Sequence, residues 1–278
     1  MGSSTVGVGN GDILLYKPAT VTGDVAKEFI PNTADFSCNT DQLGRGKIQN
    51  RTEELAGPKP VSGGDNPNVL LVKRITSINS NITSNGGDNL SIYNQDDSDH
   101  YDDNVIEGAN PPTQPHKDTD KWPNTSGKDS SSFLIGGING GKVKPGDDIE
   151  YTIYFLSTGK NEAKKVLFCD RVPEHTTFIP AAFNSFSTQA PNGSPGVPRG
   201  ILWQYNDVIE SLTNTQDGDA GQYFPPGVEP TTVYPDIDCG GNNSNGAVVV
   251  DLGDLPNAIA PGTPTGSYGF VRFGGKVK

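Results

Sequence analysis

The sequence lacks the signatures of catalysis and is poor in apolar residues. Only 32% of its 278 residues are hydrophobic, and it has three histidines, three cysteines, two tryptophans and one methionine. It contains no G-x-S-x-G, no H-E-x-x-H, no P-loop and no dinucleotide-binding fingerprint. The histidines, His100, His116 and His175, do not lie near any nucleophile signature. We therefore expect that the protein is not an enzyme.

Long apolar segments and clusters of positive charge are also missing. No segment approaches the roughly 18 apolar residues of a membrane-spanning helix. The N-terminus, MGSSTVGVGNG, lacks the regions of a signal peptide, so the chain is either a processed mature form or cytoplasmic. With 33 acidic and 21 basic residues the net charge is −12. Because phosphate binding needs clustered Lys and Arg, nucleic acid is not an expected partner.

Turn-forming residues and alternating strand patterns are what the sequence has in abundance. It contains 35 glycines and 22 prolines, which suits short strands joined by polar loops. The clearest strand is Ile149–Phe155, where apolar side chains occupy every second position. The loop Ser157–Asn161 separates it from a second strand at Ala163–Asp170. We predict that these two strands pair as an antiparallel hairpin at the centre of a β-sandwich.

Further strands are predicted around this centre. They are Val69–Ile75, Thr176–Pro180, Gly200–Tyr205, Ala247–Leu252 and Gly269–Phe273. Residues 22–67 are typical of a loop with one or two weak strands and room for a short helix near Asn50–Ala56. The total is roughly eight to ten strands with no helix longer than two turns, which defines an all-β fold.

A set of motifs connects the chain to a known family. It comprises PGD at 145–147, the YTI strand that follows, a Ser-Thr-Gly turn at 157–159 and Asp170-x-x-Pro173, with LLVKRITSIN at 70–79 (which includes Lys73) and SYGFVRFGGKVK at 267–278. These motifs resemble the conserved-repeat domain of bacterial surface proteins, called domain of unknown function eleven. CDRVP, TNTQDGDAGQYF, NSNGAVVVDLGDLP and SYGFVRF are similar to its cyanobacterial branch. The resemblance covers about residues 68–278 and implies an Ig-like β-sandwich at the cell surface.

The chain is accordingly divided into three parts. Residues 1–22 form an N-terminal extension, residues 23–67 a loop-rich segment packed on the core, and residues 68–278 the Ig-like β-sandwich, with a long insertion at 79–132. The extension contains a short β-like run with these apolar positions: Ile13, Leu14, Leu15, Tyr16 and Val21. It is either an ordinary first strand of its own sandwich or a donor strand that completes the sheet of a neighbouring subunit.

A donor strand on a surface protein favours self-assembly. We therefore expect an extracellular structural subunit that forms a surface filament or layer with copies of itself. The alternative is a monomeric adhesion or carbohydrate-binding module that holds surface glycans through calcium. Such a module needs aromatic side chains gathered on one face, and the candidates are Trp122, Trp203, Tyr205, Tyr223 and Phe224.

Two acidic loops are candidate calcium sites. The first contains Asp96, Asp97, Asp99, Asp102 and Asp103, and the second contains Asp217 and Asp219. Calcium takes about six to eight oxygen ligands and tolerates irregular loops. The second loop lacks the full ligand spacing of an EF-hand and its terminal Glu. Solvated surface loops without metal remain the alternative for both.

The three cysteines allow one disulfide and one remaining thiol. Their spacings match no zinc, haem or iron–sulfur pattern. A bridge between Cys169 and Cys239 would close a loop of about 70 residues and fasten the long excursion after Asp217 to the core. Cys38 would then stay free or pair between chains. Three reduced thiols are the alternative.

Lys73 is a charged residue inside the apolar run Val69–Ile75, where a lysine usually points to solvent. In some pilus and adhesin Ig-like domains, which the chain also resembles, a first-strand Lys is joined to a last-strand Asn beside a buried acid. Lys73 and Asp170 match the Lys and the acid, but Ser267–Lys278 contains no Asn. A salt bridge or two solvated charges is therefore expected instead of a cross-link.

Overall fold

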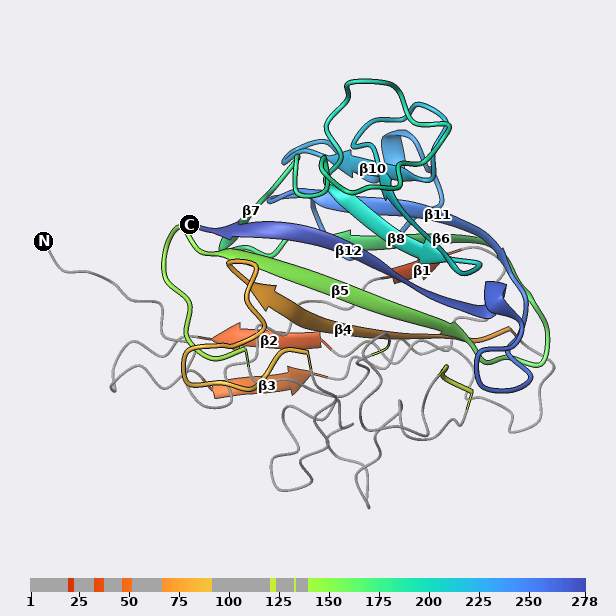
Figure 1. The fold of residues 1–278 in the computed structure, drawn as a ribbon, viewed down its shortest axis with the longest axis horizontal. Helices are drawn as coiled ribbons and strands as arrows, with labels where there is room; N and C mark the ends of the chain where they lie inside the picture. The colour runs from red at the N-terminus through yellow and green to blue at the C-terminus, as the bar shows by residue number, and fades with distance from the viewer. Residues whose placement is uncertain are drawn as a thin grey trace, which may run out of the picture.

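A computed structural model describes residues 20–22, 33–37, 47–51, 67–91, 121–123, 133 and 140–278, with the first three ranges described by their backbone alone. In these parts of the chain the elements are strands, apart from two short 3-10 helices (Figure 1). The strands are β1 (Thr20–Thr22), β2 (Thr33–Ser37), β3 (Lys47–Arg51), β4 (Val69–Ile78), β5 (Asp148–Ser157), β6 (Ala163–Arg171), β7 (Thr176–Phe178), β8 (Ile201–Tyr205), β9 (Val208–Leu212), β10 (Gly221–Phe224), β11 (Ala247–Leu255) and β12 (Tyr268–Val277). The all-β prediction is confirmed.

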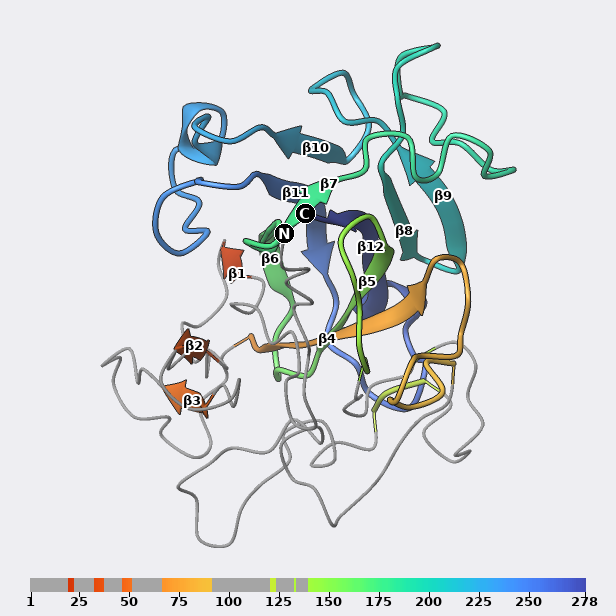
Figure 2. The same cartoon turned by 90° about the vertical axis from the view of Figure 1, so that its left-hand side faces the viewer.

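Two antiparallel sheets form the body of the fold. The first has the order β4-β5-β12-β8-β9, with β7 also paired to β12, and the second has the order β1-β6-β11-β10. In Figure 2 the strands of the second sheet lie on one side and those of the first on the other, as in a sandwich. Strands β2 and β3 pair with each other and, among the strands described, with no other.

The predicted hairpin between the two central strands is wrong. Both segments are strands, but β5 pairs with β4 and β12, whereas β6 pairs with β1 and β11. The reason is that β5 is buried on both faces, with Ile153 on the inner face and Tyr154 on the outer face. Such a strand belongs in the middle of a sheet, with a neighbour on each edge. The loop after Ser157 crosses to the other sheet, about 10 Å away.

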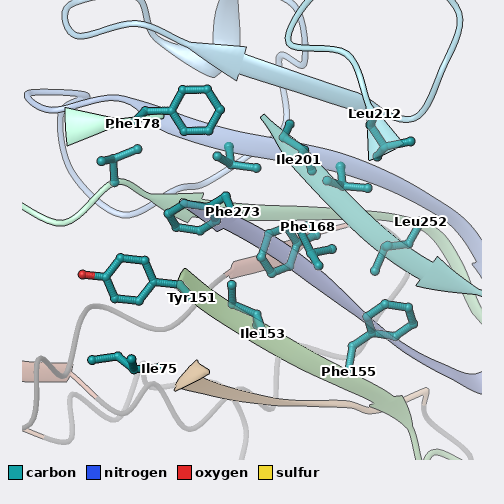
Figure 3. Packing of buried hydrophobic residues seen from close by; sticks show 14 of the residues in the cluster. Ile75, Tyr151, Ile153, Phe155, Phe168, Phe178, Ile201, Leu212, Leu252 and Phe273 are labelled. Atoms are coloured by element: carbon teal, nitrogen blue, oxygen red, sulfur yellow. The ribbon is translucent and has the colours of Figure 1, made fainter. Parts of the chain in front are cut away.

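The main core fills the space between the sheets. Alternate side chains from both sheets point into it, as the strand period of two requires. Figure 3 shows ten of its labelled members: Ile75, Tyr151, Ile153, Phe155, Phe168, Phe178, Ile201, Leu212, Leu252 and Phe273. Each large apolar side chain buried in this way stabilises the fold by about 1.5–3 kcal/mol. Ile201, Trp203 and Tyr205, at alternate positions of β8, all contact this core.

The outer face of each sheet is covered as well. Trp122 and Phe133 pack on the first sheet, where the Phe133 ring lies 5.2 Å from that of Tyr268 in an edge-to-face arrangement. On the second sheet, Ile237 and Tyr234 from the β10–β11 loop pack on a cluster that includes Phe224. The two sheets therefore lie between additional layers of loop.

Two strands that the sequence analysis missed, β9 and β10, complete the sheets. Strand β9 follows β8 through a two-residue turn, Asn206–Asp207, in which both φ angles are positive, at 50° and 61°. That combination is typical of a type I′ hairpin turn, which Asn and Asp tolerate better than most residues. The Asn-Asp pair was therefore the available signal for β9.

The predicted disulfide between Cys169 and Cys239 is confirmed. Their Cα atoms are 5.5 Å apart and the bridge spans 70 residues of sequence. It fastens the β10–β11 loop to the outer face of β6. Next to it, Arg171 Nε donates to the carbonyl oxygens of Cys239, at 3.0 Å, and Gly240, at 2.9 Å. Cys38 lies outside the described residues.

Removal of this bridge tests its contribution. The double variant C169A/C239A should lose about 4 kcal/mol of unfolding free energy, because the unfolded chain regains the freedom of a closed loop of this length. The measurement is urea unfolding with and without reductant. The oxidised wild type should be destabilised by reductant, whereas C169A/C239A should not respond. Equal stability of the oxidised wild type and the variant would contradict the prediction.

Candidate functional site

Strand β6 bears on the functional predictions, because it pairs with Thr20–Thr22, the described part of the N-terminal extension. It pairs with β11 on one side and with β1 on the other, where Thr20, Val21 and Thr22 oppose Cys169, Phe168 and Leu167. Strand β1 thus covers three of the nine β6 residues. Among the predicted donor-strand residues, Val21 lies at this edge. Ile13, Leu14, Leu15 and Tyr16 lie outside the described residues.

The side chains of β6 are sorted to its two faces by their alternation. Phe168 points into the main core, and Cys169 points outward to its disulfide partner. Asp170 comes next in the alternation and therefore points inward, where its side chain is completely buried. One short strand thus has a neighbouring strand at its edge, a covalent bridge on its outer face and a carboxyl group in the core.

Lys73 is the partner of Asp170 across the sandwich. Its Nζ lies 2.5 Å from Asp170 Oδ2, and its side chain is only 12% exposed. The expectation that Lys73 points to solvent is therefore wrong, whereas the salt bridge predicted as one alternative is confirmed. Lys73 shares the inner face of β4 with Leu71 and Ile75, so its side chain points between the sheets toward Asp170.

Burial dominates the electrostatics of this pair. It raises the pKa of Asp170, against the opposing effects of the Lys73 charge, its hydrogen bond and the Arg171 N–H. It likewise lowers the pKa of Lys73, against the attraction of Asp170. Desolvation thus favours the neutral form of both groups. Asp170 Oδ1 is buried and makes no hydrogen bond of normal geometry with the residues that the structure describes.

Two aromatic rings surround the Lys73 ammonium group. Nζ lies 5.1 Å from the centre of the Tyr151 ring and 5.4 Å from that of Phe273. These distances suit cation–π attraction, which partly offsets the loss of hydration. Lys73 and Asp170 were predicted from the sequence as a pair, whereas the two rings beside them were not. The alternation of apolar residues in β5 and β12 could place both rings on inner faces, but it could not show that they lie beside this lysine.

The second acidic loop is organised by hydrogen bonds within the protein. Asp217 Oδ2 accepts from the Ser194 N–H at 2.8 Å and from Thr213 Oγ1 at 2.9 Å. Asp219 accepts from the N–H groups of Thr213, at 2.7 Å, and Gly221, at 2.9 Å. Burial works against the charged form of Asp217, but the donors outweigh it and lower its pKa. Burial raises the pKa of Asp219.

The calcium predictions gain no support from this geometry. In the described residues no three His, Cys, Asp or Glu side chains converge as metal ligands would, and Asp217 and Asp219 already accept protein hydrogen bonds. The first acidic loop, with Asp96, Asp97, Asp99, Asp102 and Asp103, lies outside the described residues.

The candidate aromatic residues of a carbohydrate-binding face do not gather in one place. Trp122 and Phe224 are buried in the clusters on opposite outer faces. Tyr223 stacks on Phe178, with ring centres 4.0 Å apart. Trp203 and Tyr205 stack on each other at 5.6 Å and are partly buried against the main core. The five residues therefore contribute mainly to packing.

Comparison with protein-family models, curated proteins and solved structures finds no match to this chain. Within the described part of the chain, no helix has the length and apolar character needed to cross a membrane.

The Asp217 loop yields a pH-dependent prediction. D217N should lower the unfolding free energy at neutral pH by about 1 kcal/mol, because two charge-assisted hydrogen bonds of a partly exposed group are weakened. When folding lowers the pKa of a carboxyl group, that group stabilises the folded protein at any pH above its pKa in the unfolded chain, near 4. This stabilisation is lost as the pH falls through the pKa of the folded state. Wild type and D217N should therefore converge in acid. Urea unfolding at several pH values measures this, with D236N, at an exposed site, as the control.

The buried pair yields a double-mutant prediction. Either K73M or D170L alone should cost about 3–5 kcal/mol, because each leaves one buried ionisable group without its partner. The double variant K73M/D170L should be more stable than either single variant, since it buries no charge. Denaturant unfolding of the four proteins gives the coupling energy. Simple addition of the two losses would show that the groups do not interact.

Proposed function

We propose that this chain is an extracellular structural subunit that assembles with copies of itself into a surface filament or layer. The N-terminal strand of one subunit pairs with the β6 edge of the next. The observation that carries the proposal is the position of Thr20–Thr22 on that edge. A strand from the extension thus has a compatible partner edge in the same fold.

The length of chain before the sandwich supports an exchange of this strand between subunits. β1 and β4 are separated by residues 23–68, and β1 is not a hairpin neighbour of β6, from which it is far removed in sequence. The same backbone pairing can form with the β6 of another copy, which is the basis of domain swapping and strand donation. An exchanged strand then links subunits without requiring a new type of contact.

The covered outer faces also support assembly through a strand edge. Aromatic side chains and loops pack over both sheets, so the apolar surface of each sheet is already used within the chain. The exposed large apolar residues in the described regions are Ile82, Val208, Ile209, Val228 and Ile259. Apart from adjacent Val208 and Ile209, they are separated in sequence.

The disulfide supports an extracellular location. Disulfides such as Cys169–Cys239 persist in oxidising compartments and are rare in the cytosol. The bridge also stabilises the strand that would receive the donated segment, because Cys169 lies in β6 opposite Thr20. Cys169 thus belongs both to the disulfide that supports an extracellular location and to the strand proposed to receive the donated segment.

Truncation tests the assembly. Electron microscopy of the purified chain should show regular filaments or layers, and a variant lacking residues 1–22 should remain dispersed. A variant lacking only residues 1–12 is the matched control, because it keeps the apolar run and should still assemble. Dispersed monomers for all three proteins would refute self-assembly.

A cysteine pair identifies which subunit receives the strand. Thr22 opposes Leu167 in the β1–β6 register, so T22C/L167C places two thiols across this contact. Oxidation after assembly should produce a ladder of covalent oligomers on a non-reducing gel if the strand is exchanged. T22C alone is the control. Cross-linked monomers without a ladder would show that β1 stays on its own subunit.

A further inference from the structure

The outer edge of β9 is an open end of the first sheet. Strand β9 pairs with β8 on one side, and on its other side Ser211 exchanges backbone hydrogen bonds with the segment Thr188–Ala190. Backbone groups alternate in direction along a strand, so the N–H and C=O of Ile209 point the same way as those of Ser211. Among the described residues no backbone group bonds to them. Ile209 therefore offers a donor and an acceptor to one more strand.

The side chains at this edge are apolar on both faces of the sheet. Val208 is 49% exposed and Ile209 is 41% exposed. Because the two residues are adjacent in a strand, their side chains lie on opposite faces. Edge strands are commonly protected from pairing by Lys or Pro, and β9 contains neither. The edge thus fits an incoming segment that is also apolar on both faces.

Hydrogen bonds hold this edge in place and set its charge. Tyr268 Oη donates to Asp207 Oδ1 at 3.1 Å, and Trp203 Nε1 donates to Glu210 Oε1 at 3.1 Å. The edge is therefore preorganised, which lowers the entropy cost of binding. The two acidic residues stand on either side of the exposed apolar pair, so they favour a segment that carries a positive charge.

The N-terminal extension contains a segment of this kind. Ile13–Tyr16 is apolar at four consecutive positions, so it has apolar side chains for both faces of a sheet. Lys17 follows and supplies a positive charge beside the apolar run. Pro18 comes next, and because it has no N–H it limits the length of any strand that this run adds.

This run does not fit the β6 edge together with β1. In the observed register Thr20 opposes Cys169, so continued pairing would set Tyr16 opposite Pro173. Strand β6 ends at Arg171, and Pro173 has no N–H to donate. The chain from Tyr16 to Thr20 reaches at most about 14 Å. Since β1 and β9 lie on opposite sides of the sandwich in Figure 2, the run meets the β9 edge of a different copy from the one whose β6 holds β1.

We propose that the β9 edge is a second assembly surface, which binds Ile13–Lys17 of another copy as an added strand. The added strand exchanges backbone hydrogen bonds with Ile209 and covers both exposed apolar side chains. This inference rests on the proposed self-assembly. One extension then contacts two sandwiches, with β1 on a β6 edge and the run before Pro18 on a β9 edge.

Photo-cross-linking from the edge tests which segment binds there. Val208 is replaced by p-benzoylphenylalanine in the full-length chain, and the assembled protein, mixed from two nitrogen isotopes, is irradiated and digested. We expect cross-linked peptides that contain residues 13–17 and combine both isotopes. Cross-links to a second β9, to any other segment or only within one copy would overturn the proposal, as would assemblies without a cross-link.

The variant I209P tests the backbone contact. Proline removes only the N–H that points away from β8, a position at which an edge strand tolerates it. We expect the protein concentration needed for assembly to rise about tenfold, because one hydrogen bond of the added strand is lost. I209V is the matched control, because it keeps the N–H and an apolar β-branched side chain, and it should assemble as the wild type does. Thermal unfolding checks that both variants are folded, and the cross-link decides if I209P is not.

The outcomes separate this contact from the assembly on which it rests. Assembly of wild type and folded I209P at the same concentration would overturn the β9 contact and leave the β6 exchange in place. Dispersed wild-type chains would overturn both.

Discussion

Apolar contact between the two sheets is the constraint on which the rest of this structure depends. The chain has few hydrophobic residues and concentrates them in the strands, so that β5 is buried on both faces. A strand with two apolar faces requires cover on each side, which the opposite sheet provides for one and Trp122 and Phe133 provide for the other. The polar loops are thereby held to the body of the fold by a small number of aromatic anchors.

Desolvation by that core gives the Lys73–Asp170 pair its character. The same two side chains at the surface would be hydrated and weakly coupled, whereas between the sheets their charges are poorly compensated and their contact is short. The adjacent Cys169 points away from the core and forms a disulfide. Two adjacent residues of β6 thus have different roles: Cys169 forms a disulfide on the outer face, and Asp170 forms an ion pair in the core.

The sequence predicted the positions of the strands better than it predicted which strands and side chains contact each other. Alternation identified the main strands, and the positions of Cys169 at the end of a strand and Cys239 in a long loop suggested the disulfide as one of two alternatives. The assignment of β5 and β6 to different sheets was missed, since a short loop is compatible with a hairpin and with a crossing between sheets. The inward orientation of Lys73 was missed because it depends on Asp170, which is 97 residues away.

The pairing of β12 has a mechanical consequence. This strand lies between β5 and β8 and is in register with β5 over nine consecutive pairs, from Tyr268 to Lys276. A pull along the strand axis loads these pairs in shear, so they share the tension and must yield together. Peeling a strand from an edge, as at the short β1, breaks its pairs one after another at low force. The fold thus combines a centre that resists a pull along the strands with a short edge strand whose pairs a peeling force breaks singly.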